Sequence, residues 1–122
     1  MASLLIVSGP NEGDYYPIGK RTLVVGRDQA CPVQLTDELV SRRHLQIRGE
    51  GDGRFVLLDM KSANGTWLNG RQIEVEIELA DNDEISVGNS KLVFTRRDFP
   101  DRESALLHYK QRGQRGQATI KQ

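Results

Sequence analysis

The chain has few of the features that mark a secreted or membrane protein. Among its 122 residues there is one cysteine, Cys31, so no disulfide can form within the chain, which fits a reducing compartment. The longest purely aliphatic run, Leu4–Val7, is far shorter than the roughly 20 residues that span a bilayer. No basic residue precedes this run, as one would in a secretory signal peptide. We therefore expect a cytoplasmic protein without a membrane segment.

The chain also lacks an excess of charge of either sign. Lysine and arginine together number 17, and so do aspartate and glutamate, which gives a formal net charge of zero. A nucleic-acid-binding protein usually carries a basic surplus, often with aromatic side chains interleaved among the basic ones. The composition therefore argues against nucleic-acid binding. Any anion that the protein binds must be held by a local group of side chains.

Motifs for catalysis, metals and nucleotides are missing as well. No glycine-rich loop of the Walker or dinucleotide type is present, and His44, His108 and Cys31 are too scattered for a zinc site. His44 follows Ser41 closely enough to suggest a catalytic pair. A serine hydrolase, however, presents its serine on a strained turn with a base and an orienting acid, and no such turn is present. We therefore expect no enzyme, no metal and no cofactor.

Short segments rich in β-branched and aromatic residues follow one another up to residue 97. They are Leu4–Val7, Tyr15–Ile18, Thr22–Val25, His44–Arg48, Phe55–Leu58, Gln72–Glu76, Glu84–Val87 and Lys91–Thr95. Turn signals such as Asn64-Gly65 and Asn69-Gly70 separate them. No stretch before residue 98 sustains a helical period. Regular short strands of this kind predict an all-β sandwich or barrel.

The C-terminal part of the chain has a different pattern. The segment 98–101 indicates the start of a helix, with a capping carboxylate, a proline in the first turn and a further acid. Leu106 and Tyr109 would share one face of this helix with Phe99. A helix this short is marginal alone in water, so it either docks on the strands or is only partly formed. Gly113 is expected to end it, and the polar residues that follow are expected to be disordered.

Three short motifs supply the parts of an anion-binding site. They are Gly26-Arg27, Ser41-Arg42-Arg43-His44 and the stretch from Ser62 to Gly70, and each sits where a strand meets a loop. Arginine offers a rigid fork of donors that matches phosphate oxygens, and serine adds a short neutral donor. An asparagine amide donates and accepts at once, which suits it to hold a peptide backbone. None of these groups needs to move a proton or attack a carbon.

The order of these motifs resembles the forkhead-associated (FHA) family of phosphothreonine-binding domains. Two further patterns carry the resemblance, an early one at Gly9-Pro10…Gly13…Ile18 and a late one at Leu79…Asn82-Asp83-Glu84-Ile85…Gly88. Asn82 stands where glycine is common, and asparagine tolerates the left-handed backbone better than most residues. The resemblance implies an FHA-like eleven-stranded β-sandwich over residues 1–97, whose loops at one end form the site. A short helix and a disordered tail over residues 98–122 complete this prediction.

The resemblance also implies roles for single residues of the binding loops. Arg27 is similar to the arginine that contacts the phosphate, and Ser41 to the serine whose hydroxyl bonds a phosphate oxygen. Arg42 occupies a position that often reaches phosphate as well. If a strand begins at residue 43, Arg42 and Arg43 face opposite ways, and we favour Arg42 for the phosphate. Asn64 is similar to the asparagine that hydrogen-bonds the peptide backbone.

One position departs from the family pattern. Some members have a threonine where this chain has Ala63, and the hydroxyl of that threonine touches the phosphate. Ser62 is the candidate to replace this contact. Gly26, His44 and Gly65 are expected to support the site, the histidine by hydrogen-bonding loop backbone.

As a whole, the resemblance implies a phosphothreonine-dependent protein–protein interaction module, an adaptor in Ser/Thr kinase signalling. Its expected partners are proteins that carry phosphothreonine, the substrates of a Ser/Thr protein kinase. One alternative is a degenerate FHA module that binds unphosphorylated protein, which Ala63 alone favours. A nucleic-acid-binding protein is the weaker alternative. A further hypothesis is self-association through phosphorylated Thr119, a residue of the tail.

Overall fold

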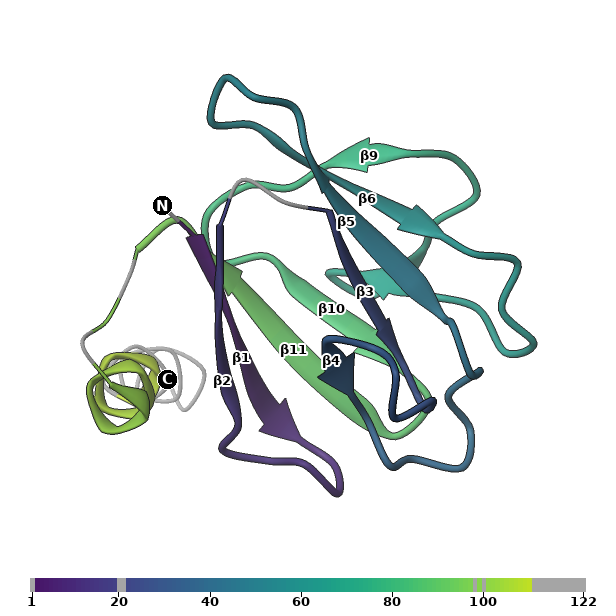
Figure 1. The fold of residues 1–122 in the computed structure, drawn as a ribbon, viewed down its shortest axis with the longest axis horizontal. Coiled ribbons are helices and arrows are strands. Elements are labelled where there is room, and N and C mark those ends of the chain that lie inside the picture. The colour runs from purple at the N-terminus through teal and green to yellow at the C-terminus, as the bar shows by residue number, and fades with distance from the viewer. Residues whose placement is uncertain (1, 20–21, 98, 100, 111–122) are drawn as a thin grey trace, which may run out of the picture.

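The computed structural model describes residues 2–19, 22–97, 99 and 101–110, and these residues form a β-sandwich with one helix (Figure 1). Eleven strands lie within the described ranges. They are β1 (Ala2–Ser8), β2 (Tyr15–Ile18), β3 (Leu23–Gly26), β4 (Val33–Gln34), β5 (Leu45–Gly49), β6 (Phe55–Asp59), β7 (Trp67–Leu68), β8 (Arg71–Gln72), β9 (Ile77–Glu78), β10 (Glu84–Val87) and β11 (Ser90–Thr95).

The strands form two sheets that face each other. The six-stranded sheet has the order β2-β1-β11-β10-β7-β8, and the five-stranded sheet has the order β4-β3-β5-β6-β9. The pairing of β3 with β4 is parallel, and the other strand pairs are antiparallel. Alternate residues of each long strand point inward, so Leu4, Ile6 and Phe94 of one sheet and Ile47 and Leu57 of the other are fully buried.

The predicted fold class is confirmed, and so are most of the predicted strands. Seven of the eight predicted segments match an observed strand to within two residues at each end. The prediction for Gln72–Glu76 is wrong, because β8 ends at Gln72 and residues 73–76 lie outside any strand. The N–H of Ile73 still bonds to Thr66 O at 2.9 Å. After this bond the chain leaves the six-stranded sheet and joins the other sheet at β9.

Two asparagines adopt the left-handed backbone that their turns require. Asn82 has φ of 70° at the turn before β10, where the family commonly has glycine, so the predicted tolerance of asparagine is confirmed. Asn69 has φ of 50° and precedes Gly70, with φ of 87°, in the two-residue turn between β7 and β8. Positive φ at both central residues is the geometry that favours Asn-Gly in tight hairpins.

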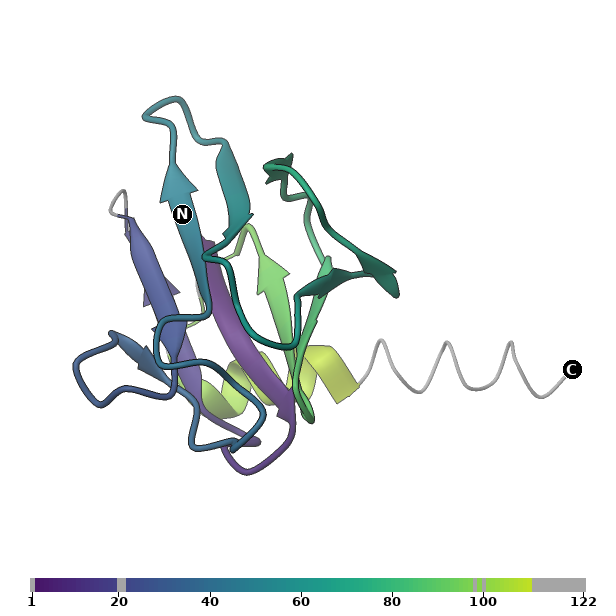
Figure 2. The ribbon, with the colours of Figure 1, turned by 90° about the vertical axis from the view of Figure 1, so that its right-hand side faces the viewer.

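The C-terminal helix docks on the sandwich. It spans 102–110, the last residues that the structure describes. Ala105 is 2% exposed, and the helix covers the outer face of the six-stranded sheet at Leu5 and Val93, which lie opposite each other on β1 and β11. The Tyr15 hydroxyl accepts a hydrogen bond from the backbone N–H of Phe99 at 2.9 Å. Figure 2 shows the helix lying across the strands.

The helix begins later than the sequence predicts. Asp101 is the capping residue, because its Oδ1 accepts a hydrogen bond from the N–H of Ser104 at 2.8 Å. Asp98, the carboxylate expected in this role, lies outside the described residues, as do Gly113 and the rest of the tail. No helix among the described residues is long and apolar enough to cross a membrane.

The cap gives the first prediction. Asp101→Ala should weaken the docked helix by about 1 kcal/mol, because the N–H of Ser104 loses its acceptor. Amide hydrogen exchange should therefore become faster across 102–110 while the exchange of the strands stays unchanged. Asp101→Asn is the matched control, since asparagine caps a helix as well. Equal exchange in the alanine and asparagine variants would show that the cap does not hold the helix.

Candidate functional site

Four connections meet at one end of the sandwich, at the lower right of Figure 1. They are 27–32 between β3 and β4, 35–44 between β4 and β5, 60–66 between β6 and β7, and the turn 88–89 between β10 and β11. The β5–β6 hairpin lies at the opposite end. The binding residues predicted from the sequence all lie on the first three of these loops, so the fold gathers them as expected.

Gly26 ends β3 where the chain passes against the loop 35–44. A side-chain carbon at this position would lie 2.1 Å from the carbonyl oxygen of Arg42. This distance is far inside van der Waals contact, so only glycine fits. The close approach lets the N–H of Arg27 bond to Ser41 O at 3.0 Å and the N–H of Asp28 bond to Arg42 O at 3.1 Å. Gly26 therefore fixes the first two binding loops against each other.

His44 links the second and third binding loops from inside the protein. Its side chain is fully buried. The Nδ1 atom accepts a hydrogen bond from the N–H of Ser41 at 3.0 Å, and Nε2 lies 2.8 Å from the carbonyl oxygen of Gly65. Because a carbonyl only accepts, this arrangement requires the neutral ring with its proton on Nε2. Neither ring nitrogen contacts the Ser41 hydroxyl. His44 therefore supports the backbone of the two loops and does not form a catalytic pair with Ser41.

The hydroxyl of Ser41 keeps its proton available. Its Oγ accepts a hydrogen bond from the N–H of Ala63 at 3.0 Å. The hydroxyl makes no hydrogen bond as a donor to any part of the chain that the structure describes. A half-buried Ser41 is thus oriented by its neighbour and can still donate to an anion.

Arg27 is held along its length and exposed at its end. The Nε atom donates to the carbonyl oxygen of Val40 at 3.0 Å, whereas its two terminal amino groups bond to no described residue. Arg42 and Arg43 are exposed as well. The charge of Arg43 acts on the pKa of the Cys31 thiol, which burial raises and Arg43 partly lowers.

The third loop is organised by Asp59, a residue that the sequence analysis did not single out. The Asp59 carboxylate accepts hydrogen bonds from the Ser62 hydroxyl at 2.6 Å, the Thr66 hydroxyl at 2.7 Å and the N–H of Ser62 at 3.0 Å. Burial would raise the pKa of Asp59, but these hydrogen bonds outweigh it and hold the pKa below its ordinary value. The spacing of an aspartate three residues before a serine is the sequence signal for this turn.

Ser62 and Asn64 are both bonded within the protein. Ser62 gives its hydroxyl proton to Asp59 and accepts a hydrogen bond from the N–H of Gly65 at 3.0 Å. The Asn64 amide donates to the carbonyl oxygen of Leu39 at 2.9 Å, and its side chain is exposed. Because an amide has a second N–H and an acceptor oxygen, Asn64 retains groups that can bond to a peptide.

Asp37 is the second anchor that the sequence analysis missed. It is 3% exposed, and its carboxylate accepts hydrogen bonds from the N–H of Leu39 at 3.0 Å, the N–H of Asn89 at 2.8 Å and the hydroxyl of Ser90 at 2.8 Å. Burial would raise the pKa of Asp37, but the hydrogen bonds from Leu39, Ser90 and Asn89 hold it below its ordinary value. The second binding loop is thereby tied to the β10–β11 turn.

Comparison with known proteins identifies the family. The family model for the FHA domain matches residues 23–88. The chain belongs to the FHA domain family, as its motifs and its two-sheet fold indicate. The match includes every residue of the candidate site.

Curated relatives carry the same domain within longer chains. The glycogen accumulation regulator GarA of Mycolicibacterium smegmatis is 38% identical over 93 residues, and the oxoglutarate dehydrogenase inhibitor of Corynebacterium jeikeium is 37% identical over 93 residues. Each match covers 76% of this chain, but only 58% of the first relative and 63% of the second. These names describe a regulator and an inhibitor, and no catalytic family is indicated.

Solved structures with the same fold include FHA domains bound to partners. The FhaA FHA domain, complexed with the intracellular domain of Rv3910, is 34% identical with a TM-score of 0.69, and the match covers 77% of this chain and 99% of that one. The N-terminal FHA domain of Rad53p from S. cerevisiae, complexed with a phosphothreonine peptide, is 26% identical with a TM-score of 0.69. That match covers 77% of this chain and 91% of the yeast domain.

The low pKa values of Asp37 and Asp59 give the second prediction. Because both carboxylates are more acidic in the fold than in the unfolded chain, their contribution is present above the ordinary pKa of about 3.9 and is lost as pH falls further. Urea unfolding should therefore show stability that falls below about pH 4. Asp37→Asn should remove about 2–4 kcal/mol at neutral pH, since an amide nitrogen would face buried donors, and should lessen the acid-dependent loss.

Glu38→Gln serves as the control for this measurement. Glu38 is exposed and neighbours Asp37 in the same loop. Its amide variant should unfold with the same midpoint and the same pH dependence as the parent protein. If Asp37→Asn behaved like Glu38→Gln, the anchoring role of Asp37 would be wrong.

Proposed function

We propose that Arg27, Ser41 and Arg42 hold the phosphate of a phosphothreonine while Asn64 holds the peptide backbone beside it. As a member of the FHA family, the chain is a phosphothreonine-dependent protein–protein interaction module of Ser/Thr kinase signalling. The double attachment of Arg27 carries the proposal. Its backbone N–H bonds to Ser41 O and its Nε bonds to Val40 O, both at 3.0 Å. The guanidinium and the serine hydroxyl are therefore presented by two loops that are fixed against each other.

The donor set matches the chemistry of a phosphate monoester. Phosphothreonine carries a charge of roughly −1.5 to −2 at neutral pH and three strong acceptor oxygens. Two guanidinium groups and one free hydroxyl proton supply donors for these oxygens. Each hydrogen bond to a charged group contributes about 1.5–3 kcal/mol, and micromolar affinity requires about 8 kcal/mol. Three such contacts together with the backbone contacts of Asn64 account for binding in this range.

Ser62 has a supporting role in this proposal, although the sequence analysis assigned it to the phosphate. Its single hydroxyl proton is given to Asp59 at 2.6 Å. Donation to a phosphate would require breaking this bond. Gly26, His44 and Gly65 complete the support of the loops. The departure at Ala63 removes one side-chain contact and leaves its backbone N–H to orient Ser41.

Several broader features belong to the same proposal. The module acts in the cytoplasm, where kinases and phosphorylated partners meet, and it catalyses no reaction itself. Residues 1–97 form the binding domain, and residues 98–122 form an appended helix and tail. Self-association through phosphorylated Thr119 remains a hypothesis, because Thr119 lies outside the described residues.

The third prediction tests the phosphate contact. Arg27→Ala should abolish measurable binding of a phosphothreonine peptide, because the guanidinium that is held at Val40, next to Ser41 in the chain, is lost. The fold should be retained, since the side chain is exposed and its removal leaves the backbone bond to Ser41 in place. Isothermal titration calorimetry measures the affinity, and circular dichroism checks the fold.

Arg43→Ala is the matched control for Arg27→Ala. Both residues are exposed arginines on the binding loops. The Arg43 variant removes the same charge but should reduce the affinity far less, because the proposal assigns the phosphate to Arg27 and Arg42. A similar loss in both variants would mean that the peptide senses only the overall positive charge of the loops.

The fourth prediction concerns the choice between phosphothreonine and phosphoserine. The two residues differ by one methyl group, which a fixed set of loops can recognise by packing. Burial of a methyl group contributes about 0.8 kcal/mol, and close-fitting pockets discriminate by roughly 1–3 kcal/mol, or ten- to two-hundred-fold. A titration of two otherwise identical peptides should show this preference for phosphothreonine. Equal affinities would contradict the assignment of the module as a phosphothreonine reader.

A further inference from the structure

A groove runs between the free edges of the two sheets. β8 is the last strand of the six-stranded sheet, β9 is the last strand of the five-stranded sheet, and 73–76 connects them. The hollow between them has a volume of about 450 Å³. We call it the edge groove, and its lining residues are Leu68, Asn69, Arg71, Gln72, Ile73, Glu74, Val75 and Ile77. It lies beside the loops of the phosphate site and contains none of the residues assigned to phosphate or peptide binding.

The edge groove presents apolar side chains to solvent. Val75 is 76% exposed and Ile77 is 39% exposed. Only two other large hydrophobic residues are exposed in the part of the chain that the structure describes, Leu39 in the second binding loop and Leu107 on the helix. Apolar side chains that gather in a hollow, rather than scatter singly, are typical of an interaction surface.

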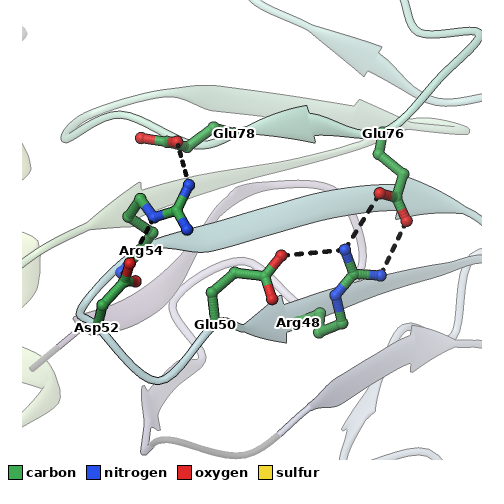
Figure 3. A network of polar contacts seen from close by, with 6 residues as sticks. All are labelled: Arg48, Glu50, Asp52, Arg54, Glu76 and Glu78. Carbon is green, nitrogen blue, oxygen red and sulfur yellow. Dashed lines mark hydrogen bonds and ion pairs between the residues drawn. The ribbon is translucent and has the colours of Figure 1, made fainter.

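Ion pairs orient the glutamates on both sides of Ile77 (Figure 3). Both terminal nitrogens of Arg48 bond to the Glu76 carboxylate, at 2.8 and 3.1 Å, and Arg54 lies 3.6 Å from Glu78. Glu76 and Glu78 are thereby held on the outer face of the five-stranded sheet. Since alternate residues of a strand point to opposite sides, Ile77, which lies between them and pairs with the buried Leu57, faces the groove.

The strand β9, beside the groove, has one edge that is free to form backbone hydrogen bonds. β9 pairs with β6 through Val56 and Leu57, and its other edge pairs with no strand in the described ranges. A free strand edge offers N–H and C=O groups that an extended chain can pair with, while alternate side chains of that chain enter the adjoining hollow. The geometry therefore favours an extended segment over a helix as the occupant.

The charge beside the edge groove specifies the occupant further. Glu74 lines the groove, and Glu50, Asp52, Glu76 and Glu78 form the network of Figure 3 with only Arg48 and Arg54. The network thus holds four carboxylates and two guanidinium groups and keeps an excess of negative charge. Within the groove itself, Arg71 and Glu74 carry opposite charges. The excess of negative charge favours a segment with basic side chains.

We propose that the edge groove docks an extended segment of a partner protein in which apolar and basic side chains alternate. The apolar side chains contact Val75 and Ile77, and the basic ones face Glu74 and the carboxylates of β9. This surface is separate from the phosphothreonine site, so binding at the two sites can be measured independently. A partner that carries both features would be held at two points of one domain.

The probe for this fifth prediction is an acetylated and amidated heptapeptide in which lysine and valine alternate. Added to the ¹⁵N-labelled full chain, it should cause saturable shifts of the backbone amides within residues 71–78. Val75→Asn should weaken this binding by about tenfold, the loss expected when one apolar side chain leaves a contact. Leu107→Asn is the matched control, because Leu107 is similarly exposed but lies on the helix. It should leave the affinity unchanged.

The role of charge needs its own pair of variants. Glu74→Lys should weaken the binding of the heptapeptide, whereas Glu103→Lys makes the same change on the exposed face of the helix and should not. A peptide with glutamate in place of lysine should fail to bind. The affinity for a phosphothreonine peptide should be the same in all four variants, which separates this proposal from the proposed function.

Four results would overturn the proposal. These are the absence of saturable shifts, shifts centred outside residues 71–78, equal effects of the Val75 and Leu107 variants, and equal binding of the lysine and glutamate peptides. Light scattering on the free protein adds a fifth. A dimer that Val75→Asn dissociates would show that the groove is already occupied by a second copy of the chain.

Discussion

One buried imidazole fixes the second and third binding loops relative to each other. The ring of His44 accepts the N–H of Ser41 from one loop and donates to the carbonyl of Gly65 from the other. Neither group has a strand partner, so without the ring both would be left unpaired in the interior, where an unpaired polar group is costly. The positions of the Ser41 hydroxyl and of Asn64 depend on this bridge. The contacts proposed for Ser41 and Asn64 therefore rest on a residue that does not touch the peptide.

The same principle extends to two carboxylates. Asp37 fixes the second loop to the β10–β11 turn, and Asp59 closes the third loop on itself. Each neutralises several donors at once, which explains why burial does not raise its pKa. A loop that leaves a sheet loses the ladder that would pair its backbone, and buried acceptors replace that ladder here. The loops that carry Arg27 and Arg42 are also bonded to each other, from the N–H of Arg27 to Ser41 O and from the N–H of Asp28 to Arg42 O.

The sequence was sufficient for the long strands. β1 and β6 are rich in apolar residues and β10 alternates strictly, whereas β4, β7 and β9 have two residues each and show no pattern. The residues around Val75 resemble a strand in sequence, but they belong to a segment that crosses between sheets. Arg27 and Asn64 could be named as candidates because they belong to motifs. Asp37 could not, because its role arises only where loops distant in sequence meet.

The loops are hydrogen-bonded in place before any ligand arrives, and this affects the rates of binding and release. A peptide meets a surface that needs little ordering, so most of the entropy lost on binding is the peptide's own. No loop closure has to precede or follow contact, and arrival is then governed by diffusion and orientation. Different phosphorylated partners should therefore reach the site at similar rates and differ mainly in how long they stay. A module of this kind converts the sequence around a phosphothreonine into the lifetime of a complex.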